Sequence, residues 1–418
     1  MKVSTTKIGN PIIMFATTCL FAFLHGLMMS MPITTSSYFE AAFHLNSADI
    51  LNIYSFYLVA GIVMQIPIGI LFAKYGLRSV MLVSASIALI GIILHMFSSS
   101  PTILLISRLI SGLGCSTSYL SALYVAMNSF SNRYVVLLIG IIETVSTVGS
   151  IVAANPLYEL LNKFGWNVIG VVLIAVFALL LAMIYLFIVN DANREIESIS
   201  RSEILSRLKT IMTNKAVILL IAYAFLNWFI IMSFAGYWIR DYMVHIHKYA
   251  TDVSLNLSNI YWTSFLVGNL VIGSLASSFK KIKIATFTLA KLGVITFLIM
   301  AIPSIFGYNL VVIFCVIAGV SSVAVILSFA LIPYVTNSLC EKDIITSIVN
   351  MAIITGGVVG QYVFGYVVYH AKVRQVYFHN PLFSNSYYIA LWVYVLAAIA
   401  AWVIFLKLSK LLVKHEHE

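Results

Sequence analysis

Three charged residues, Arg108, Glu143 and Lys291, stand inside long apolar segments and away from the segment ends. If such segments cross a membrane, a charge near the centre costs roughly 2.5–3.5 kcal/mol on insertion scales. Each of the three is therefore a candidate for binding or proton chemistry. His25 and His95 stand in similar segments, and an imidazole changes charge near neutral pH.

Arg108 follows Pro101 by seven residues, or roughly 10 Å along a helix at 1.5 Å per residue. Its planar guanidinium suits a carboxylate or phosphate of a solute, or a titrating carboxylate of the protein. The alternative is a structural arginine that donates to backbone carbonyls of neighbouring helices.

Glu143 lies ten residues into the next apolar segment, roughly 15 Å along it and near its middle. A carboxyl group whose surroundings change between an apolar pocket and a nearby cation can gain and lose a proton. A short loop joins the two segments, so we expect Glu143 to lie close to Arg108. The alternative is a protonated carboxyl bonded between helices. His25 could relay a proton, or could be a neutral ring bonded to another helix.

The other polar residues of the apolar segments have simpler explanations. The alkyl chain of Lys291 can reach the nearer membrane surface, which favours a structural role, and His95 is assigned no role. Uncharged polar side chains must face other helices or a cavity, because the bilayer core holds no water. These cavity-lining candidates are Gln65, Tyr119, Asn155, Asn227, Asn269 and Gln361. For each alone, helix packing is the simpler role.

The elements that carry these residues are long apolar helices. The chain has 418 residues, 61% hydrophobic and 9% charged, with a mean hydropathy of +1.03. A soluble domain has about 25% charged residues, so a cytosolic globular protein is excluded. A membrane span needs about 20 apolar residues, and this length predicts an all-α polytopic membrane protein with twelve transmembrane helices. The spans are roughly 11–33, 48–72, 78–98, 101–128, 134–157, 167–190, 216–240, 255–278, 284–306, 308–332, 344–369 and 385–407.

Lys and Arg are distributed unevenly over the two sides of these spans. Cytoplasmic termini would place seventeen of them on the cytoplasmic side and five on the other, and the positive-inside rule favours this orientation. The net charge of +10 is scattered singly, so nucleic acid is not an expected partner. The four cysteines lack metal-ligand spacing and no nucleotide motif is present, so we expect neither metal nor cofactor.

A polar stretch, residues 191–215, divides the spans into two groups of six. We predict an N-terminal six-helix bundle over 1–190, a cytoplasmic linker over 191–215 and a C-terminal six-helix bundle over 216–418. Ile204, Leu205, Leu208 and Ile211 recur at helical spacing in the linker. They predict an amphipathic helix on the membrane surface, with a solvated tether as the alternative.

Short sequence matches relate the two groups of spans at an offset of 204–209 residues. One of them pairs Ser111-Gly112 with Ala318-Gly319. The repeat position of Arg108 is Cys315, and this asymmetry favours a binding role for the arginine. Gly149 and the glycines around Gly356 are expected to let helices approach closely.

Two motifs resemble signatures of one family. The loop after the second span resembles G-x-L-x-D-[RK]-x-G-x-[RK] through the residues Gly69, Leu71, Lys74, Gly76 and Arg78. The fourth span resembles R-x-x-x-G through Arg108 and Gly112, and the turn at Gly165 is similar to that of a bacterial branch. On these residues the chain resembles a major facilitator superfamily (MFS) transporter of the bacterial 12-span branch. The resemblance implies two bundles, related by duplication, around a midplane site.

The chain departs from the family pattern at Ala73, which occupies the acidic position of the loop signature. In the family this acid joins a charge network that closes the cytoplasmic side. Gly69, Lys74, Gly76 and Arg78 are the predicted cytoplasmic gate loop. Without the acid, we expect the two cations to meet carbonyls at a helix C-terminus or lipid phosphates.

The predicted function is secondary active transport of a small polar, anionic solute by alternating access across the bacterial inner membrane. The solute would be an amino acid, an organic acid or a carboxylate-type metal chelator, taken up with protons by a monomer in membrane lipid. Arg108, Glu143 and His25 are the predicted solute- and proton-coupling residues. No enzyme is expected, because the spans lack a clustered catalytic motif. Proton-driven efflux of drugs or metabolites and a non-transporting sensor or scaffold are the alternatives.

Overall fold

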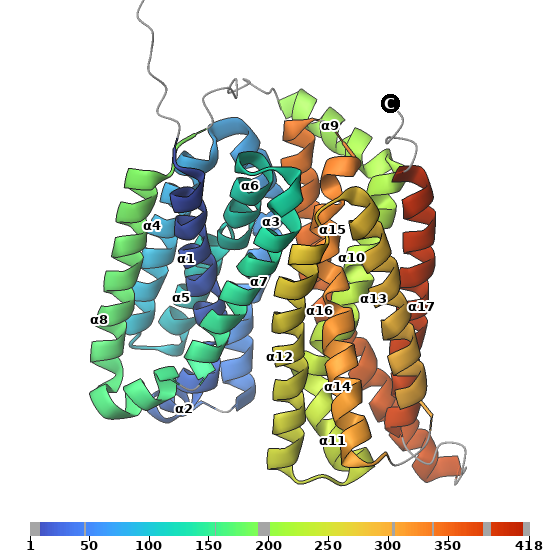
Figure 1. The fold of residues 1–418 in the computed structure, drawn as a ribbon. Helices are drawn as coiled ribbons and strands as arrows, with labels where there is room; N and C mark the ends of the chain where they lie inside the picture. Colours follow the sequence, from blue (N-terminus) through green and yellow to red (C-terminus); the bar gives the residue numbers. More distant parts are fainter. Residues whose placement is uncertain are drawn as a thin grey trace, which may run out of the picture. The chain divides into compact units, whose positions relative to one another are not determined.

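The computed structural model describes residues 9–45, 47–154, 156–190, 201–302, 306–336, 338–378 and 386–412, and these residues form helices without a β-strand (Figure 1). Asn155, one of the predicted cavity-lining residues, lies outside them. The chain divides into two compact units, Met1–Ser131 with Ile141–Ser206, and Asn132–Gly140 with Arg207–Glu418. The predicted boundaries at 190 and 216 stay a prediction.

The first unit is built from antiparallel helices that begin at clear sequence signals. Its helices are α1 (Pro11–Ser30), α2 (Pro32–Phe43), α3 (Ser47–Tyr75), α4 (Leu77–Met96), α5 (Pro101–Cys115), α6 (Ser118–Ser129), α7 (Asn132–Ala154) from Ile141 on, and α8 (Pro156–Phe187). The Ser100 hydroxyl caps α5 by accepting from the Ile103 N–H, and Pro101 follows it at the first helical position. Gly165 breaks α8 with a φ of 78°, where the sequence predicts a turn.

The second unit has a comparable series of helices, with a π-helical segment η1 and a 3₁₀ segment η2. They are α10 (Lys215–Ser233), η1 (Phe234–Trp238), α11 (Ile239–His247), α12 (Thr251–Leu275), α13 (Phe279–Met300), α14 (Tyr308–Ser322), α15 (Ala324–Ala330), η2 (Ile332–Tyr334), α16 (Leu339–Phe378) and α17 (Ser386–Leu412). The first turns of α7, from Asn132 to Gly140, group with this unit. The tightly packed core of this unit includes Phe234, Tyr242, Tyr261 and Tyr394.

Eleven helical segments in the described part are long and apolar enough to cross a membrane, and each corresponds to a predicted span. The remaining predicted span is α12, which has 25 residues and is therefore long enough. It falls short in hydropathy because it carries polar residues such as Asn256, Asn259 and Asn269. Asn269 is fully buried, so polarity in this helix is directed at protein rather than lipid.

The two units repeat the same helix crossing. Gly112 of α5 lies so close to α3 that an added Cβ would be 2.4 Å from the carbonyl oxygen of Tyr57. Gly319 of α14 lies equally close to α12, where an added Cβ would be 2.4 Å from the carbonyl oxygen of Tyr261. The Tyr57 hydroxyl bonds the Cys115 thiol, and the Tyr261 hydroxyl bonds the Ser322 hydroxyl. These pairs stand at the predicted repeat offset.

A second crossing is also repeated. An added Cβ would lie 2.1 Å from the Phe23 carbonyl oxygen at Gly149, and 2.3 Å from the Phe225 carbonyl oxygen at Gly356. Cβ atoms cannot be accommodated at such distances, so these glycines allow α1 to approach α7 and α10 to approach α16. The predicted close approach of helices at these glycines is confirmed.

The amphipathic helix predicted inside the linker forms as α9 (Arg201–Thr213). Ile211 is buried, whereas Lys209 and Met212 are exposed on the same helix. Residues 191–200 and the side chains of Ile204 and Leu205 lie outside the description. A position of α9 on the membrane surface stays a prediction.

Candidate functional site

Arg108 lies on the buried face of α5. Leu104, Ser107, Arg108, Ser111 and Cys115 recur at spacings of three and four residues and are all buried in the unit. The side chain of Arg108 is 1% exposed, the largest of the fully buried side chains. The sequence thus places a guanidinium inside the first unit.

Two aromatic rings of α3 flank this guanidinium. Its carbon Cζ lies 4.9 Å from the ring centre of Tyr54 and 4.5 Å from that of Tyr57. Its Nη2 donates to the carbonyl oxygen of Met28 on α1 over 3.0 Å. Nε and Nη1 have no hydrogen-bond partner among the described residues, so three N–H donors stay unused.

Each of the two tyrosines is itself held by a hydrogen bond. The Tyr57 hydroxyl lies 2.7 Å from Nδ1 of His25, and the two rings stack with centres 5.7 Å apart. The Tyr54 hydroxyl lies 2.6 Å from the Thr35 hydroxyl, which donates to the carbonyl oxygen of Met31. Arg108 and His25, two of the predicted coupling residues, therefore meet through Tyr57.

His95 of α4, to which the sequence assigned no role, belongs to the same cluster. It is 2% exposed, its Nδ1 lies 3.1 Å from the Ser107 hydroxyl, and its Nε2 has no partner in the described structure. Its ring centre lies 6.2 Å from that of Tyr54 and 5.5 Å from that of Trp166. The electrostatic influence of Arg108 extends to this ring.

Glu143 bonds to Tyr119 rather than to Arg108. The two side chains share a hydrogen bond between α7 and α6, and both are partly buried. Arg108 instead faces α1 and α3, and an ion pair with Glu143 is not among the contacts of the described residues. Tyr119, the partner of Glu143, lies on α6, and the break at Ser116 and Thr117 separates α6 from α5, which carries Arg108.

Three of the predicted cavity-lining residues are bonded to helix backbones. Gln65 donates to the carbonyl oxygen of Gly61 over 2.9 Å, Asn227 to that of Tyr223 over 2.8 Å, and Gln361 to that of Met232 over 3.3 Å. Asn227 also lines a small cavity of the second unit together with Ser321 and Ser322. Asn269 is fully buried, and neither atom of its amide has a partner among the described residues. Lys291 is exposed on α13.

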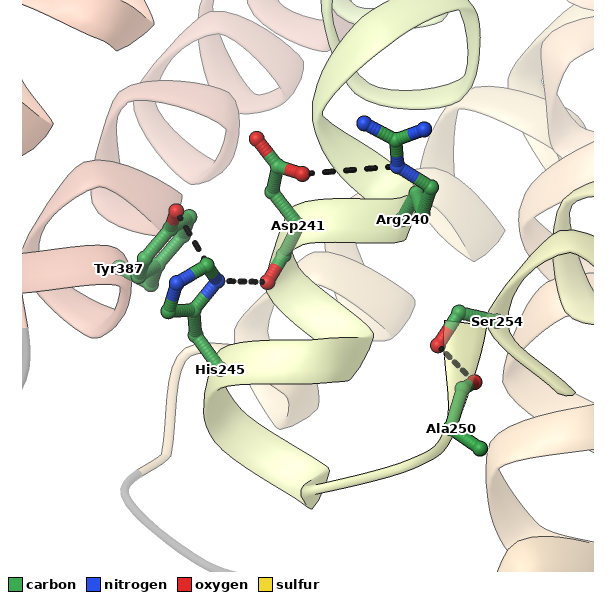
Figure 2. A network of polar contacts seen from close by, with 6 residues as sticks. All are labelled: Arg240, Asp241, His245, Ala250, Ser254 and Tyr387. Atoms are coloured by element: carbon green, nitrogen blue, oxygen red, sulfur yellow. Dashed lines mark hydrogen bonds and ion pairs between the residues drawn. The ribbon is translucent and has the colours of Figure 1, made fainter. Parts of the chain in front are cut away.

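A polar network in the second unit is of a different kind (Figure 2). Nδ1 of His245 donates to the carbonyl oxygen of Asp241 over 2.8 Å, and the Tyr387 hydroxyl lies 3.4 Å from the same nitrogen. Nε of Arg240 lies 3.6 Å from Oδ1 of Asp241, with the arginine side chain 54% exposed. An exposed ion pair contributes little stability. Arg240 and His245 are exposed and Asp241 is only partly buried, so this network offers no buried charged group.

The comparisons with known proteins settle the family. A model of the Major Facilitator Superfamily matches residues 18–360. The chain belongs to this superfamily. No curated protein matches the chain by sequence.

Solved structures of MFS transporters share the fold. The outward conformation of FucP is 17% identical, with a TM-score of 0.74 and coverage of 95% of this chain and 99% of that chain. The proton:xylose symporter XylE is 14% identical, with a TM-score of 0.71 and 95% of both chains covered. A bacterial homologue of the iron transporter ferroportin is 11% identical, with a TM-score of 0.74 and coverage of 95% and 99%. The all-α MFS fold predicted from the sequence is confirmed.

The loop that resembles the MFS signature connects α3 to α4. Gly76 has a φ of 75°, and an added Cβ would lie 2.7 Å from Oδ1 of Asn190. Arg78 donates from Nη2 to the Tyr185 carbonyl oxygen over 2.6 Å, near the C-terminal end of α8, as predicted. Lys74 lies over the ring of its neighbour Tyr75 at 5.2 Å, and Gly69 is buried in α3. The side chain of Ala73 is outside the described structure.

The sequence missed three members of the Arg108 cluster, Tyr54, Tyr57 and His95. Tyr54 and Tyr57 are three residues apart, a spacing that places two rings on one face of a helix. Two aromatic rings on one helix face could have indicated a cation–π partner for an arginine buried in the same bundle. The position of His95 carried no comparable local pattern.

Proposed function

We propose that this MFS member transports a small solute with a carboxylate group, which binds at Arg108. The single observation that carries the proposal is the guanidinium of Arg108, 1% exposed, with three N–H donors unused between the rings of Tyr54 and Tyr57. Uptake with protons across the bacterial inner membrane, with both termini in the cytoplasm, is the proposed direction and coupling.

The electrostatics of this site favour an anion. Burying an ion costs several kcal/mol, and a single carbonyl and two aromatic faces offset only part of that for Arg108. A carboxylate would supply the missing charge and accept two parallel hydrogen bonds from the planar guanidinium. The two rings restrict the orientation of the guanidinium, so the ordering cost of binding is reduced.

Two hydrogen-bonded pairs support the proposed proton coupling. The carboxyl group of Glu143 bonds to Tyr119, and Nδ1 of His25 bonds to Tyr57, whose ring also contacts Arg108. Only Tyr57 lies between His25 and Arg108 in this chain of contacts. A proton gained or lost at His25 therefore changes the surroundings of the anion site through that one side chain. The solved Escherichia coli relative is named the fucose:proton symporter FucP, 16% identical with a TM-score of 0.70, and XylE is named a proton:xylose symporter.

The anion site is tested by titrating purified protein in detergent with organic acids and following heat of binding and melting temperature. A carboxylate should stabilise the parent by mass action. Arg108→Lys keeps the charge but loses the bidentate geometry, and we expect affinity to fall by about 10- to 100-fold. Lys291→Ala removes an exposed cation of the second unit and should leave the affinity unchanged. Equal affinity in the parent and in Arg108→Lys, or stabilisation by apolar cations alone, would contradict the proposal.

Proton coupling is tested in proteoliposomes with Glu143→Gln, which keeps a hydrogen bond to Tyr119 but cannot titrate. We expect uptake driven by a pH gradient to be lost, whereas exchange of labelled for unlabelled solute continues. Gradient-driven uptake at the parent rate would refute Glu143 as a coupling residue.

A further inference from the structure

The protonation pattern of His95 follows from its neighbour Ser107. The single hydroxyl proton of Ser107 is donated to the carbonyl oxygen of Leu104 over 2.6 Å. The hydroxyl oxygen of Ser107 lies 3.1 Å from Nδ1 of His95. Because the hydroxyl proton is already donated to Leu104, this second bond requires a proton on Nδ1. A neutral His95 ring therefore presents Nε2 as a hydrogen-bond acceptor, and this atom is buried without a partner among the described residues.

Arg108 and His95 both lie against Tyr54. Cζ of Arg108 is 4.9 Å and the His95 ring centre is 6.2 Å from the Tyr54 ring centre, so the two groups are at most about 11 Å apart. Ser107, which orients His95, directly precedes Arg108 on α5. A buried set of unused donors and a buried unused acceptor thus lie against the same tyrosine ring, at most about 11 Å apart, a span that a small molecule with a hydrogen bond of about 2.8 Å at each end can bridge.

We propose that the solute is a hydroxycarboxylate, whose carboxylate binds Arg108 and whose hydroxyl donates to Nε2 of His95. This inference rests on the proposed function, because it assigns the carboxylate to Arg108. It makes His95 a specificity-determining residue. A carboxylate without a hydroxyl would leave Nε2 buried and unsatisfied, and an unsatisfied buried acceptor is costly.

The charge of the site favours a hydroxyl over an ammonium as the second group. An ammonium beside His95 would lie within about 11 Å of the guanidinium in a weakly screened interior, where like charges repel. No acidic side chain among the described residues contacts Arg108 to relieve that repulsion. A hydroxyl donates the same hydrogen bond without adding charge.

The test uses pairs of acids that differ by one hydroxyl: lactate and propionate, malate and succinate, citrate and tricarballylate. Each is titrated into the purified full chain in detergent by calorimetry. We expect the hydroxylated member of the tightest pair to bind about tenfold more tightly than its partner in the parent. In His95→Phe, which keeps an aromatic ring against Tyr54 and Trp166, we expect this ratio to fall within twofold.

Ser107→Ala provides a second variant in case His95→Phe fails to fold. It removes the acceptor that places the proton on Nδ1, so both neutral forms of His95 become available and the ratio should fall by a smaller factor. Affinity for the acid without a hydroxyl should change little in either variant, because Arg108 is intact. A general structural defect would instead weaken both members of a pair equally.

The outcomes separate the two proposals. Binding that depends on Arg108 but shows a ratio within twofold in the parent overturns the hydroxycarboxylate and leaves the anion site standing. A tenfold ratio that persists in His95→Phe also overturns it, as does tighter binding of alanine than of lactate. If none of the acids binds, or if Arg108→Lys leaves their affinity unchanged, the proposed function fails as well.

Discussion

The ring of Tyr57 contacts the guanidinium of Arg108, with its centre 4.5 Å from Cζ. The hydroxyl of the same tyrosine lies 2.7 Å from Nδ1 of His25. One side chain therefore contacts the buried cation with its ring face and bonds a titratable imidazole through its hydroxyl. The two contacts can be separated by mutation, because one depends on the ring and the other on the hydroxyl.

Tyr57→Phe should separate proton coupling from solute affinity. The phenylalanine ring keeps the aromatic face against Arg108 and loses the hydroxyl's bonds to His25 and to the Cys115 thiol. We expect the dissociation constant of the solute to stay within about threefold and the pH dependence of uptake to change. Tyr57→Leu removes both contacts and should weaken binding by about 5- to 30-fold, since a desolvated cation–π contact contributes roughly 1–2 kcal/mol. Equal affinities in the two variants would show that the ring does not support Arg108.

The repeated crossing at Gly112 and Gly319 predicts that alanine at either position lowers the stability of the protein by a similar amount. Only the change at Gly112 is expected to weaken solute binding. An added methyl group would lie 2.4 Å from a backbone oxygen at either position, and overpacking of this kind costs about 1–3 kcal/mol. Gly112→Ala displaces α3, which carries Tyr54 and Tyr57, so it should also weaken solute binding. Gly319→Ala should lower the melting temperature and leave solute binding at Arg108 intact.

Gly61→Ala is the control for these two variants, because nothing lies within 4 Å of an added Cβ there. Its melting temperature should equal or exceed that of the parent, since alanine favours a helix by up to about 1 kcal/mol. Melting curves and solute titrations of the three variants check the prediction. A Gly319→Ala variant that loses solute affinity as strongly as Gly112→Ala would contradict it.

The fold could be predicted because each span is recorded locally in the sequence. Length and hydropathy identify the spans, Ser100-Pro101 and Gly165 mark a helix start and a turn, and the match of Gly112 to Gly319 indicates the repeat. One span, α12, meets the length requirement but has a low hydropathy because it contains several asparagines. One of them, Asn269, is fully buried. A hydropathy rule alone does not see that a helix faces protein rather than lipid.

The candidate site could be predicted only in part, because side-chain partners depend on how neighbouring helices are rotated. Burial of Arg108 follows from its place in an apolar segment, but its contact with Tyr57 depends on the close crossing of α5 and α3 at Gly112. The expected partner Glu143 bonds instead to Tyr119 of α6, which a helix break separates from Arg108 on α5. Sequence spacing gives no measure of such a break.

The bond from Arg78 to the Tyr185 carbonyl oxygen predicts that this arginine stabilises the first unit. It is a short, charge-assisted bond of 2.6 Å at the negative end of α8, and the guanidinium also lies 4.9 Å from the Tyr185 ring centre. Arg78→Ala should reduce the free energy of unfolding by about 1–2 kcal/mol and lower the melting temperature. Lys74→Ala is the matched control, since Lys74 lies over the ring of its neighbour Tyr75 in the described structure, and its melting temperature should equal that of the parent. Equal melting temperatures for Arg78→Ala and the parent would refute the contribution.

His247, which follows the seventh span, predicts that the stability of the second unit falls at acid pH. Its ring is buried against Tyr242, Tyr249 and Phe306, and burial lowers the pKa of its imidazole below the ordinary value of 6.5. The folded state therefore keeps the neutral ring, whereas the unfolded state takes up a proton as the pH falls through about 6.5. The unfolded state binds more protons in that range, so the contribution to stability is complete above it and is lost as the pH falls below it.

The measurement is the melting temperature of the purified protein in detergent between pH 7.5 and pH 5.5. His247→Phe keeps an aromatic ring in the same packing and cannot take up a proton, so its melting temperature should fall less over this range than that of the parent. His245→Gln changes an exposed histidine two residues away and should retain the profile of the parent. Identical profiles for His247→Phe and the parent would show that protonation of His247 does not drive the loss of stability, and the acid sensitivity would then belong to other groups.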